Sequence, residues 1–334
     1  MRIKLICFLA ITLLGMPACT QSPNCSSKAV FCAALVTDTR GLNDFGMNHE
    51  AWSGLQQSKV EGVANQIAYI ESVDTRDYEK NINFFVNAGY DVIVTSGIAL
   101  SDATLRSTKL YPDSVFIGMN QADEGSTRNF IPVTFPEDHM GFFAGALAAS
   151  LTKTKIIGAV CETSGIAAMW RYCEGFRAGA NYVDETVNTM VVYRDNGSRE
   201  KLFIDAEWGA ENATTLIQDG ADVLFAVGGE TGVGALRAAN EAGIRTIGAE
   251  RDQGAALGDQ GSEVVTSILA GASTTVQMLI RSVRGGNLST AVVSPIEYVP
   301  FDELVTRRIV LRMDEIMGGL LSGDIKTNVP QEKP

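Results

Sequence analysis

Asp38, the polar residue best placed to meet a ligand, follows a buried apolar run near the start of the chain. Residues 29–36 form that run, and Met47, Ala51 and Leu55 are spaced for one face of a helix. A strand that ends in a polar, glycine-containing turn before a helix leaves free backbone N–H groups at the carboxyl edge of a sheet. Ligands of open α/β proteins bind at that edge. Asp38 is therefore predicted either to contact a ligand or to cap the helix, and Asn43 or Asp44 can also cap it.

A second glycine-containing turn, Gly-Gly-Glu-Thr-Gly at residues 228–232, follows another apolar strand. It lacks the Lys-Ser/Thr ending of a phosphate-binding loop and the spacing of a dinucleotide-binding fingerprint. A tight strand-to-helix turn whose backbone N–H groups face a cleft is the better interpretation. Gly228 and Gly229 are therefore predicted to lie at a ligand-binding edge.

The chain offers little for acid–base or nucleophilic catalysis. It contains two histidines, His49 and His139, and neither lies beside a nucleophile motif such as Gly-x-Ser-x-Gly. Asp38 and Glu250 could still form a catalytic pair if they approach each other across a cleft. A non-enzymatic binding protein is favoured, and an enzyme of similar architecture is the alternative.

Repeated alternation of strands and helices predicts the scaffold that positions these residues. Strands are predicted at residues 65–70, 90–95, 115–119, 156–161, 187–192, 223–227, 245–249 and 262–269. Helices are predicted at residues 77–88, 101–110, 138–150, 167–183, 207–218, 232–241, 272–284 and 303–319. This pattern indicates an α/β fold with parallel sheets covered by helices on both faces. Prolines in and beside residues 130–135 predict a connector there rather than a central strand.

The length of 334 residues exceeds the usual single core, so two lobes are expected. The alternation of strands and helices restarts after residue 138 and returns once more near the end of the chain. This late return predicts that the chain crosses between the lobes more than once.

The first residues predict export. A short basic region at residues 2–4 precedes an apolar run at residues 5–14, which is too short to span a bilayer. The three residues before Cys19, Met-Pro-Ala, resemble a bacterial lipobox. Residues 1–18 are therefore predicted to be a lipoprotein signal peptide, Cys19 the lipidated residue, and residues 19–28 a tether. An ordinary signal peptide with a chance cysteine is the alternative, and it would also export the protein.

The charge of the chain limits its partners. There are 27 basic and 39 acidic residues, for a formal net charge of −12. Such a surface repels nucleic acid and offers no polybasic patch to a membrane. Attachment to a membrane would therefore depend on the lipid at Cys19.

Four cysteines follow the predicted lipidation site: Cys25, Cys32, Cys161 and Cys173. Cys32 lies in the first apolar run and is predicted to be a core residue. Cys161 and Cys173 flank a strand-to-helix turn, so an oxidising compartment would permit a disulfide between them, and two free buried thiols are an equally open alternative. No cysteine spacing suits a structural zinc site, and no metal site is expected.

Several short motifs occur in a fixed order along the chain. The first reads Val-Thr-Asp and then Gly-Leu-Asn-Asp-x-Gly-Met-Asn-x-x-Ala-Trp-x-Gly-Leu within residues 36–55. The later ones lie at residues 95–103, 141–145, 175–179, 220–223, 228–232 and 247–253. Together they resemble the basic membrane protein family, also called PnrA-like, of substrate-binding lipoproteins of ABC importers.

The resemblance covers roughly residues 29–286 and implies a type I periplasmic-binding-protein fold. In this fold two Rossmann-like lobes are joined by three crossovers and bind the ligand in the cleft between them. The implied N-terminal lobe comprises residues 29–134 plus 252–288. The implied C-terminal lobe comprises residues 135–251 plus 289–325.

The resemblance also implies the ligand contacts. Members that bind purine nucleosides hold the base between two aromatic rings, while acidic residues contact its polar edge and the sugar. The positions of this chain that are expected to bind the ligand are Asp38, Met47, Asn48, Ser96, Asn120, Phe203, Gly228, Gly229 and Glu250.

Several of these positions depart from the family pattern. Met47 stands where most relatives have a phenylalanine, Asn120 and Glu250 stand where they have aspartates, and Ala270 replaces a lysine near the sugar. Phe203 can stack on one face of a flat ring, and the flexible thioether of Met47 can cover the other face. A larger ring with a sugar-like polyol fits these changes. Riboflavin is therefore favoured as the transported ligand, and a purine nucleoside is the alternative.

The resemblance further implies an ABC permease and its ATPase as partners, and a lipid membrane reached through acylated Cys19. The expected location is the periplasmic or extracytoplasmic face of the cell membrane. The protein is expected to act as a monomer without a cofactor. A nucleoside-processing enzyme stays open as an alternative. A transcription regulator of the same fold would need a basic helix-turn-helix where the leader lies.

Overall fold

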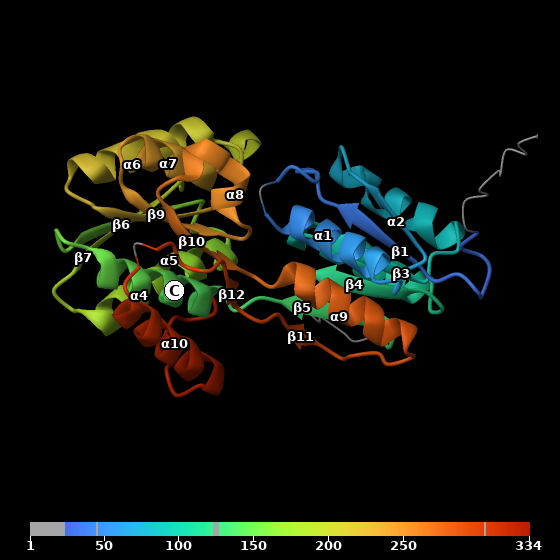
Figure 1. The fold of residues 1–334 in the computed structure, drawn as a ribbon. Coiled ribbons are helices and arrows are strands. Elements are labelled where there is room, and N and C mark those ends of the chain that lie inside the picture. The colour runs from blue at the N-terminus through green and yellow to red at the C-terminus, as the bar shows by residue number, and fades with distance from the viewer. Residues whose placement is uncertain (1–23, 45, 123–126, 304) are drawn as a thin grey trace, which may run out of the picture.

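The computed structural model describes residues 24–44, 46–122, 127–303 and 305–334, which form two lobes side by side (Figure 1). The predicted signal peptide, the lipidation site at Cys19 and the first part of the tether lie outside the described residues. Each lobe contains one six-stranded sheet with helices on both faces. The predicted α/β architecture of two lobes is confirmed.

The sheet of the first lobe has the strand order β11-β5-β4-β3-β1-β2, and that of the second lobe has the order β12-β10-β9-β8-β6-β7. All pairs are parallel except β10 with β12. The strands are β1 (Cys32–Thr37), β2 (Gln66–Ile70), β3 (Val92–Ser96), β4 (Val115–Met119), β5 (Phe130–Thr134), β6 (Ile156–Cys161), β7 (Asn188–Tyr193), β8 (Val223–Val227), β9 (Arg245–Ala249), β10 (Val264–Leu269), β11 (Val292–Val293) and β12 (Glu297–Tyr298).

Helices cover both faces of each sheet. They are α1 (Met47–Val60), α2 (Tyr78–Asn87), α3 (Ser101–Leu110), α4 (Glu137–Leu151), α5 (Ala167–Val183), α6 (Ala206–Gln218), α7 (Gly229–Glu241), α8 (Gln253–Leu257), α9 (Ala272–Arg284) and α10 (Arg307–Ser322). Ala33 and Leu35 of β1 pack with α1 and α9, whereas Ala34 and Val36 pack with α2. Because β1 is buried on both faces, its sequence is a continuous apolar run.

The chain passes between the lobes three times, at β5 to α4, at β10 to α9 and at β11 to β12. The strand pairing corrects the predicted lobe boundaries at two places. Residues 252–288 were predicted to lie in the first lobe, but β10 pairs with β9 in the second. Residues from 289 onward were predicted to lie in the second lobe, but β11 pairs with β5 in the first. Hydrogen bonds to strands distant in sequence decide both assignments.

The prediction that residues 130–135 form a connector is wrong, because β5 pairs along β4 from Phe130 to Val133. Pro132 lies inside this strand. β11 is two residues long and pairs only with Val133 and Thr134. Pro132 therefore has no paired residue on the β11 side of β5, so the strand is an edge at this position. A residue without an N–H is tolerated at such an edge.

Two disulfides are present among the described residues. Cys161 and Cys173 are bonded, which resolves the two alternatives left by their spacing. Cys32 is fully buried, as predicted, but it is bonded to Cys25 rather than a free core thiol. The first disulfide ties the segment before β1 to the sheet.

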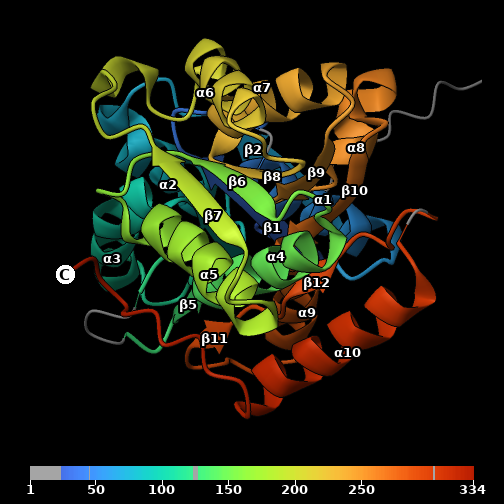
Figure 2. The same cartoon turned by 90° about the vertical axis from the view of Figure 1, so that its left-hand side faces the viewer.

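Helices α4 and α5 pack backbone against backbone through four glycines. A Cβ on Gly141 or Gly145 of α4 would collide with the carbonyl oxygen of Tyr172 or Phe176 of α5. Gly175 and Gly179 of α5 face α4 in the same way. The i, i+4 spacing puts each pair on one helix face. In Figure 2 the two helices cross within the second lobe, and α10 lies along α4.

We predict that Gly179→Ala destabilises the protein by about 1–3 kcal/mol, because the added methyl overpacks the contact with the carbonyl of Phe142. Gly318→Ala on α10 is the matched control, since a Cβ there meets nothing within 4 Å. The control should be neutral or stabilised by up to about 1 kcal/mol. Urea unfolding of both variants measures the difference, and equal midpoints would contradict the packing argument.

Candidate functional site

A cavity of about 500 Å³ lies between the two lobes at the carboxyl ends of their strands. Asp38 follows β1, Asn120 follows β4 and Glu250 follows β9, so three strands of two sheets contribute one residue each. The remaining lining comes from Thr39, Arg40, Met47, Thr75, Tyr78, Ile98, Ala99, Ile166, Ala168, Met169, Arg199, Glu200, Leu202, Phe203 and Ile204. The wall is mainly apolar, with a few charged groups among the apolar side chains. This composition is typical of a small-molecule site.

A smaller chamber of about 30 Å³ adjoins the cavity and shares Met47, Asn120 and Glu250 with it. Glu137 and Ala270 also line the chamber. The Glu137 carboxylate is almost fully buried and accepts hydrogen bonds from the Arg171 guanidinium at 2.7 and 3.1 Å. Burial raises the pKa of Glu137, although Arg171 opposes the shift.

Five of the nine predicted ligand-binding residues line the cavity, namely Asp38, Met47, Asn120, Phe203 and Glu250. The other four, Asn48, Ser96, Gly228 and Gly229, are buried behind that lining. The amide of Asn48 donates to Asp38, and the N–H of Gly229 donates to the Glu250 carboxylate. Direct contact of any of the nine residues with a ligand stays a prediction.

Strained backbone is concentrated at the cavity. Five described residues other than glycine have positive φ, and three of them, Asn120 (57°), Phe203 (65°) and Glu250 (71°), line the cavity. This conformation costs free energy for a residue with a side chain, so it persists only where neighbouring contacts enforce it. Asn120 and Glu250 each follow directly after a strand, and Phe203 lies in a turn.

A buried ion network holds the segment that carries Phe203. The Glu162 carboxylate accepts from the backbone N–H of Phe203 at 2.9 Å and from the Thr231 hydroxyl at 2.8 Å. Arg194, which is 2% exposed, donates to Glu162 and also to Asp205. Because each charge has an opposite partner, the network tolerates burial and fixes the turn.

Asp38 is engaged by the protein itself. Its Oδ2 accepts from Nε and Nη2 of Arg40 at 2.9 and 2.7 Å. Its Oδ1 accepts from the backbone N–H of Arg40 at 3.1 Å and from Nδ2 of Asn48 at 2.8 Å. The Arg40 guanidinium also lies 4.9 Å from the centre of the Phe203 ring, so a side chain of the first lobe contacts the second lobe. Asp38 lines the cavity, as its position after β1 suggested, but the sequence motif gave no sign that Arg40, two residues later, would donate to its carboxylate.

The helix cap predicted at this turn is made by Asp44. Its carboxylate accepts from the backbone N–H groups of Gly46, Asn48 and His49 at the start of α1. Burial raises the pKa of Asp44, although the Arg40 guanidinium and these N–H groups oppose the shift. Asp38 is therefore left free to interact with Arg40.

Glu250 is the most strongly shifted acid of the cavity. Burial raises the pKa of Glu250 to about 7, with a smaller contribution from the nearby Asp44, although the Arg40 guanidinium and the Gly229 N–H oppose the shift. A Cβ on Gly46 would lie 2.9 Å from its Oε2, so the carboxyl packs against the N-terminus of α1 in the other lobe. Near neutral pH this group can therefore act as either a donor or an acceptor.

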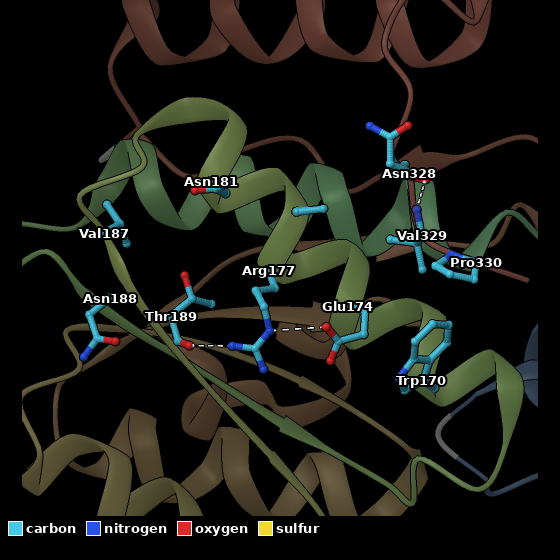
Figure 3. Close-up of a pocket in the computed structure, with 12 residues that line it drawn as sticks. Trp170, Glu174, Arg177, Asn181, Val187, Asn188, Thr189, Asn328, Val329 and Pro330 are labelled. Atoms are coloured by element: carbon cyan, nitrogen blue, oxygen red, sulfur yellow. Dashed lines mark hydrogen bonds and ion pairs between the residues drawn. The ribbon is translucent and has the colours of Figure 1, made fainter. Parts of the chain in front are cut away.

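A second, open pocket of about 510 Å³ lies on the outside of the second lobe, between α5, β7 and residues 327–330 (Figure 3). Arg177 extends across it, and its guanidinium donates to Glu174 and to the carbonyl of Thr189. The charged groups shown there thus satisfy one another, and the pocket involves one lobe only. The interlobe cavity is the better candidate for ligand binding.

Comparisons with known proteins agree with this geometry. A family model described as "ABC transporter substrate-binding protein PnrA-like" matches residues 31–293. This chain belongs to that family. The CD4+ T-cell-stimulating antigen of Listeria innocua is 27% identical over 340 residues, which cover 94% of this chain and 92% of that protein.

One further relative of this PnrA-like protein and one solved structure of similar fold are informative. The ABC transporter nucleoside-binding protein BmpA of Lactococcus lactis subsp. cremoris is 30% identical over 232 residues, covering 66% of this chain and 64% of that protein. The solved structure of an ABC transporter system solute-binding protein from Conexibacter woesei superposes with a TM-score of 0.74. It is 23% identical and covers 91% of this chain and 100% of that one.

Family membership settles the class of function. The PnrA-like protein is an extracytoplasmic substrate-binding protein of an ABC transporter rather than an enzyme. Within the ranges that the structure describes, no helix combines the length and apolar character needed to cross a bilayer.

We predict that Glu250→Gln removes a pH dependence of stability. The free carboxyl titrates near 4.5 and the folded one near 7, so between these pH values the folded state holds a proton that the unfolded state has released. The stabilising effect of Glu250 protonation is full below pH 4.5 and is lost as the pH rises through 7. Between pH 4.5 and 7 the free energy of unfolding of the wild type should therefore fall by about 3 kcal/mol relative to that of Glu250→Gln, and urea unfolding measures both. Parallel pH profiles of the two proteins would contradict the assignment.

We predict that Thr231→Val loosens the Phe203 segment. The hydroxyl donates to Glu162 and accepts from the N–H of Asp205, so its loss leaves the buried Asp205 N–H unpaired and removes one hydrogen bond from the Glu162 carboxylate, which should cost about 1–3 kcal/mol in stability. Thr214→Val on the exposed side of α6 is the control, and it should change stability by less than about 0.5 kcal/mol. Thermal and urea unfolding compare the two variants, and equal losses would refute the role of the network.

Proposed function

We propose that this PnrA-like protein captures a flat heterocycle bearing a sugar or sugar-like polyol, and that riboflavin is its transported ligand. The observation that carries the proposal is the interlobe cavity, in which Met47 of the first lobe and Phe203 of the second line one space. An aromatic ring and a flexible thioether can cover the two faces of a planar ligand.

Riboflavin is supported by the extent of the apolar wall. Ile98, Ile166, Met169 and Ile204 add to the apolar lining of the cavity, which suits a ring system with a methylated end. Ala270 in the adjoining chamber leaves no lysine there, so a long polyol meets no fixed positive charge at that point. Riboflavin is cargo in this proposal, and no cofactor is expected.

A purine nucleoside is the second candidate, favoured by the printed name of the Lactococcus relative, a nucleoside-binding protein. The ligand that copurifies with the protein distinguishes the two. A yellow preparation that releases a fluorescent flavin on denaturation supports riboflavin. A colourless preparation that releases a purine nucleoside supports the second candidate and excludes the first.

We predict that Phe203→Ala weakens ligand binding about tenfold to 100-fold, because stacking on an aromatic ring contributes about 1–3 kcal/mol. Phe84→Ala is the matched control, because Phe84 is 59% exposed on α2 and does not line the cavity. Titration calorimetry with riboflavin and with inosine measures both variants. Unchanged affinity in Phe203→Ala would exclude stacking.

Delivery of the ligand would involve an ABC permease and its ATPase, with the lobes closing about the three crossings when the ligand binds. Acylation of Cys19 would attach the protein to the extracytoplasmic face of the membrane, and the receptor would act as a monomer. These proposals rest on the family and on the leader sequence. Conversion of Cys19 to serine should release the protein from the membrane fraction of the producing cells.

A further inference from the structure

Asp38 has no capacity left for a ligand. An ionised carboxylate offers about four acceptor positions. Arg40 and Asn48 together make four hydrogen bonds to it, two on each oxygen. Both N–H groups of the Asn48 amide are also used, on Asp38 and on the carbonyl of Gly41. The acidic residue of the motif therefore positions Arg40 instead of presenting a free carboxylate.

Arg40, in contrast, keeps donors free. Nε and one N–H of Nη2 face Asp38, and among the described residues the other N–H of Nη2 and both of Nη1 donate to no protein oxygen. These groups form the outer fork of the guanidinium, and the side chain lines the cavity. Burial alone would lower the pKa of Arg40, but Asp38, Asp44 and Glu250 raise it above its ordinary value. The ligand therefore meets a fixed cation with a planar pair of donors.

We propose that Arg40 determines specificity by selecting rings that present two neighbouring acceptors, a carbonyl oxygen and a ring nitrogen. This proposal rests on the proposed function of the cavity. An arginine fork pairs with O6 and N7 of an oxopurine, whereas the amino group of adenine puts a donor in place of O6. The C4 carbonyl and N5 of a flavin form the same pair of acceptors. The preferred class is thus inosine, guanosine and riboflavin, and adenosine is disfavoured.

The chain contains a chemically matched pair on its surface. Arg76 donates through its backbone N–H, Nε and Nη2 to Asp74, two residues earlier, just as Arg40 does to Asp38. Its side chain is 87% exposed, and Arg76 does not line the cavity. Arg76→Gln therefore removes an equivalent arginine–aspartate pair without touching the site.

The test measures the affinities of riboflavin, inosine and adenosine for the wild type, Arg40→Gln and Arg76→Gln by titration calorimetry. The wild type and Arg76→Gln should bind inosine or riboflavin at least tenfold more tightly than adenosine. The affinity of Arg40→Gln for inosine and riboflavin should fall at least tenfold. Its ratio of inosine to adenosine affinity should fall to threefold or less, or invert, because a glutamine amide pairs with N6 and N7 of adenine. A purely structural role would weaken all three ligands alike.

Arg40→Lys keeps the charge beside Asp38 but has no planar fork, so it should lose the preference even if Arg40→Gln fails to fold. The inference is overturned if the wild type binds adenosine as tightly as the carbonyl ligands, or if folded Arg40→Gln or Arg40→Lys keeps the wild-type ratio. A wild type that binds none of the three ligands overturns the proposed function and this inference with it. If only the inference on Arg40 fails, the wild type still binds at least one of the three ligands.

Discussion

The close contact of α4 with α5 is the constraint on which the binding cleft depends. Glycines on both helices bring the two backbones together, so the distance and angle between the helices are set by main-chain atoms. α4 begins directly after the first crossing from β5, and the first turn of α5 supplies Ala168 and Met169 to the cavity. Tyr172, whose carbonyl packs on Gly141, also lines the adjoining chamber. A shift of this contact would therefore move one wall of the site.

Charge balance is the second constraint. Carboxyl groups from both lobes, those of Asp38, Asp44 and Glu250, interact electrostatically with the guanidinium of Arg40. Burial raises the pKa values of Asp44 and Glu250, and the charge of Arg40 opposes both shifts. Arg40 and Phe203 provide a contact between the lobes, and a ring that stacks on Phe203, as proposed, would share or replace that contact. Under the proposed function, ligand binding would therefore be coupled to how the lobes meet.

The regular elements could be predicted because their apolar pattern is local. β4, β6 and α5 begin and end where the sequence indicated, since strands buried on both faces are continuous apolar runs bounded by polar turns. β5 and the lobe to which β10 belongs could not be obtained in this way. Both depend on pairing with strands far away in the sequence, and Pro132 gave the opposite signal because its edge position is a property of the assembled sheet.

The same division applies to the cavity. Asp38, expected from the strand end after β1, and Met47 and Glu250, expected from the family resemblance, all line the cavity. The partner of each charged group is not local. Arg40 comes within reach of Phe203 and Glu250 only when two sheets are joined by three crossings, and Phe203 is held by Glu162 from a third segment. What a cleft residue presents to its ligand depends on which of its hydrogen-bonding groups the rest of the fold has already used, and a motif read along one strand does not contain that information.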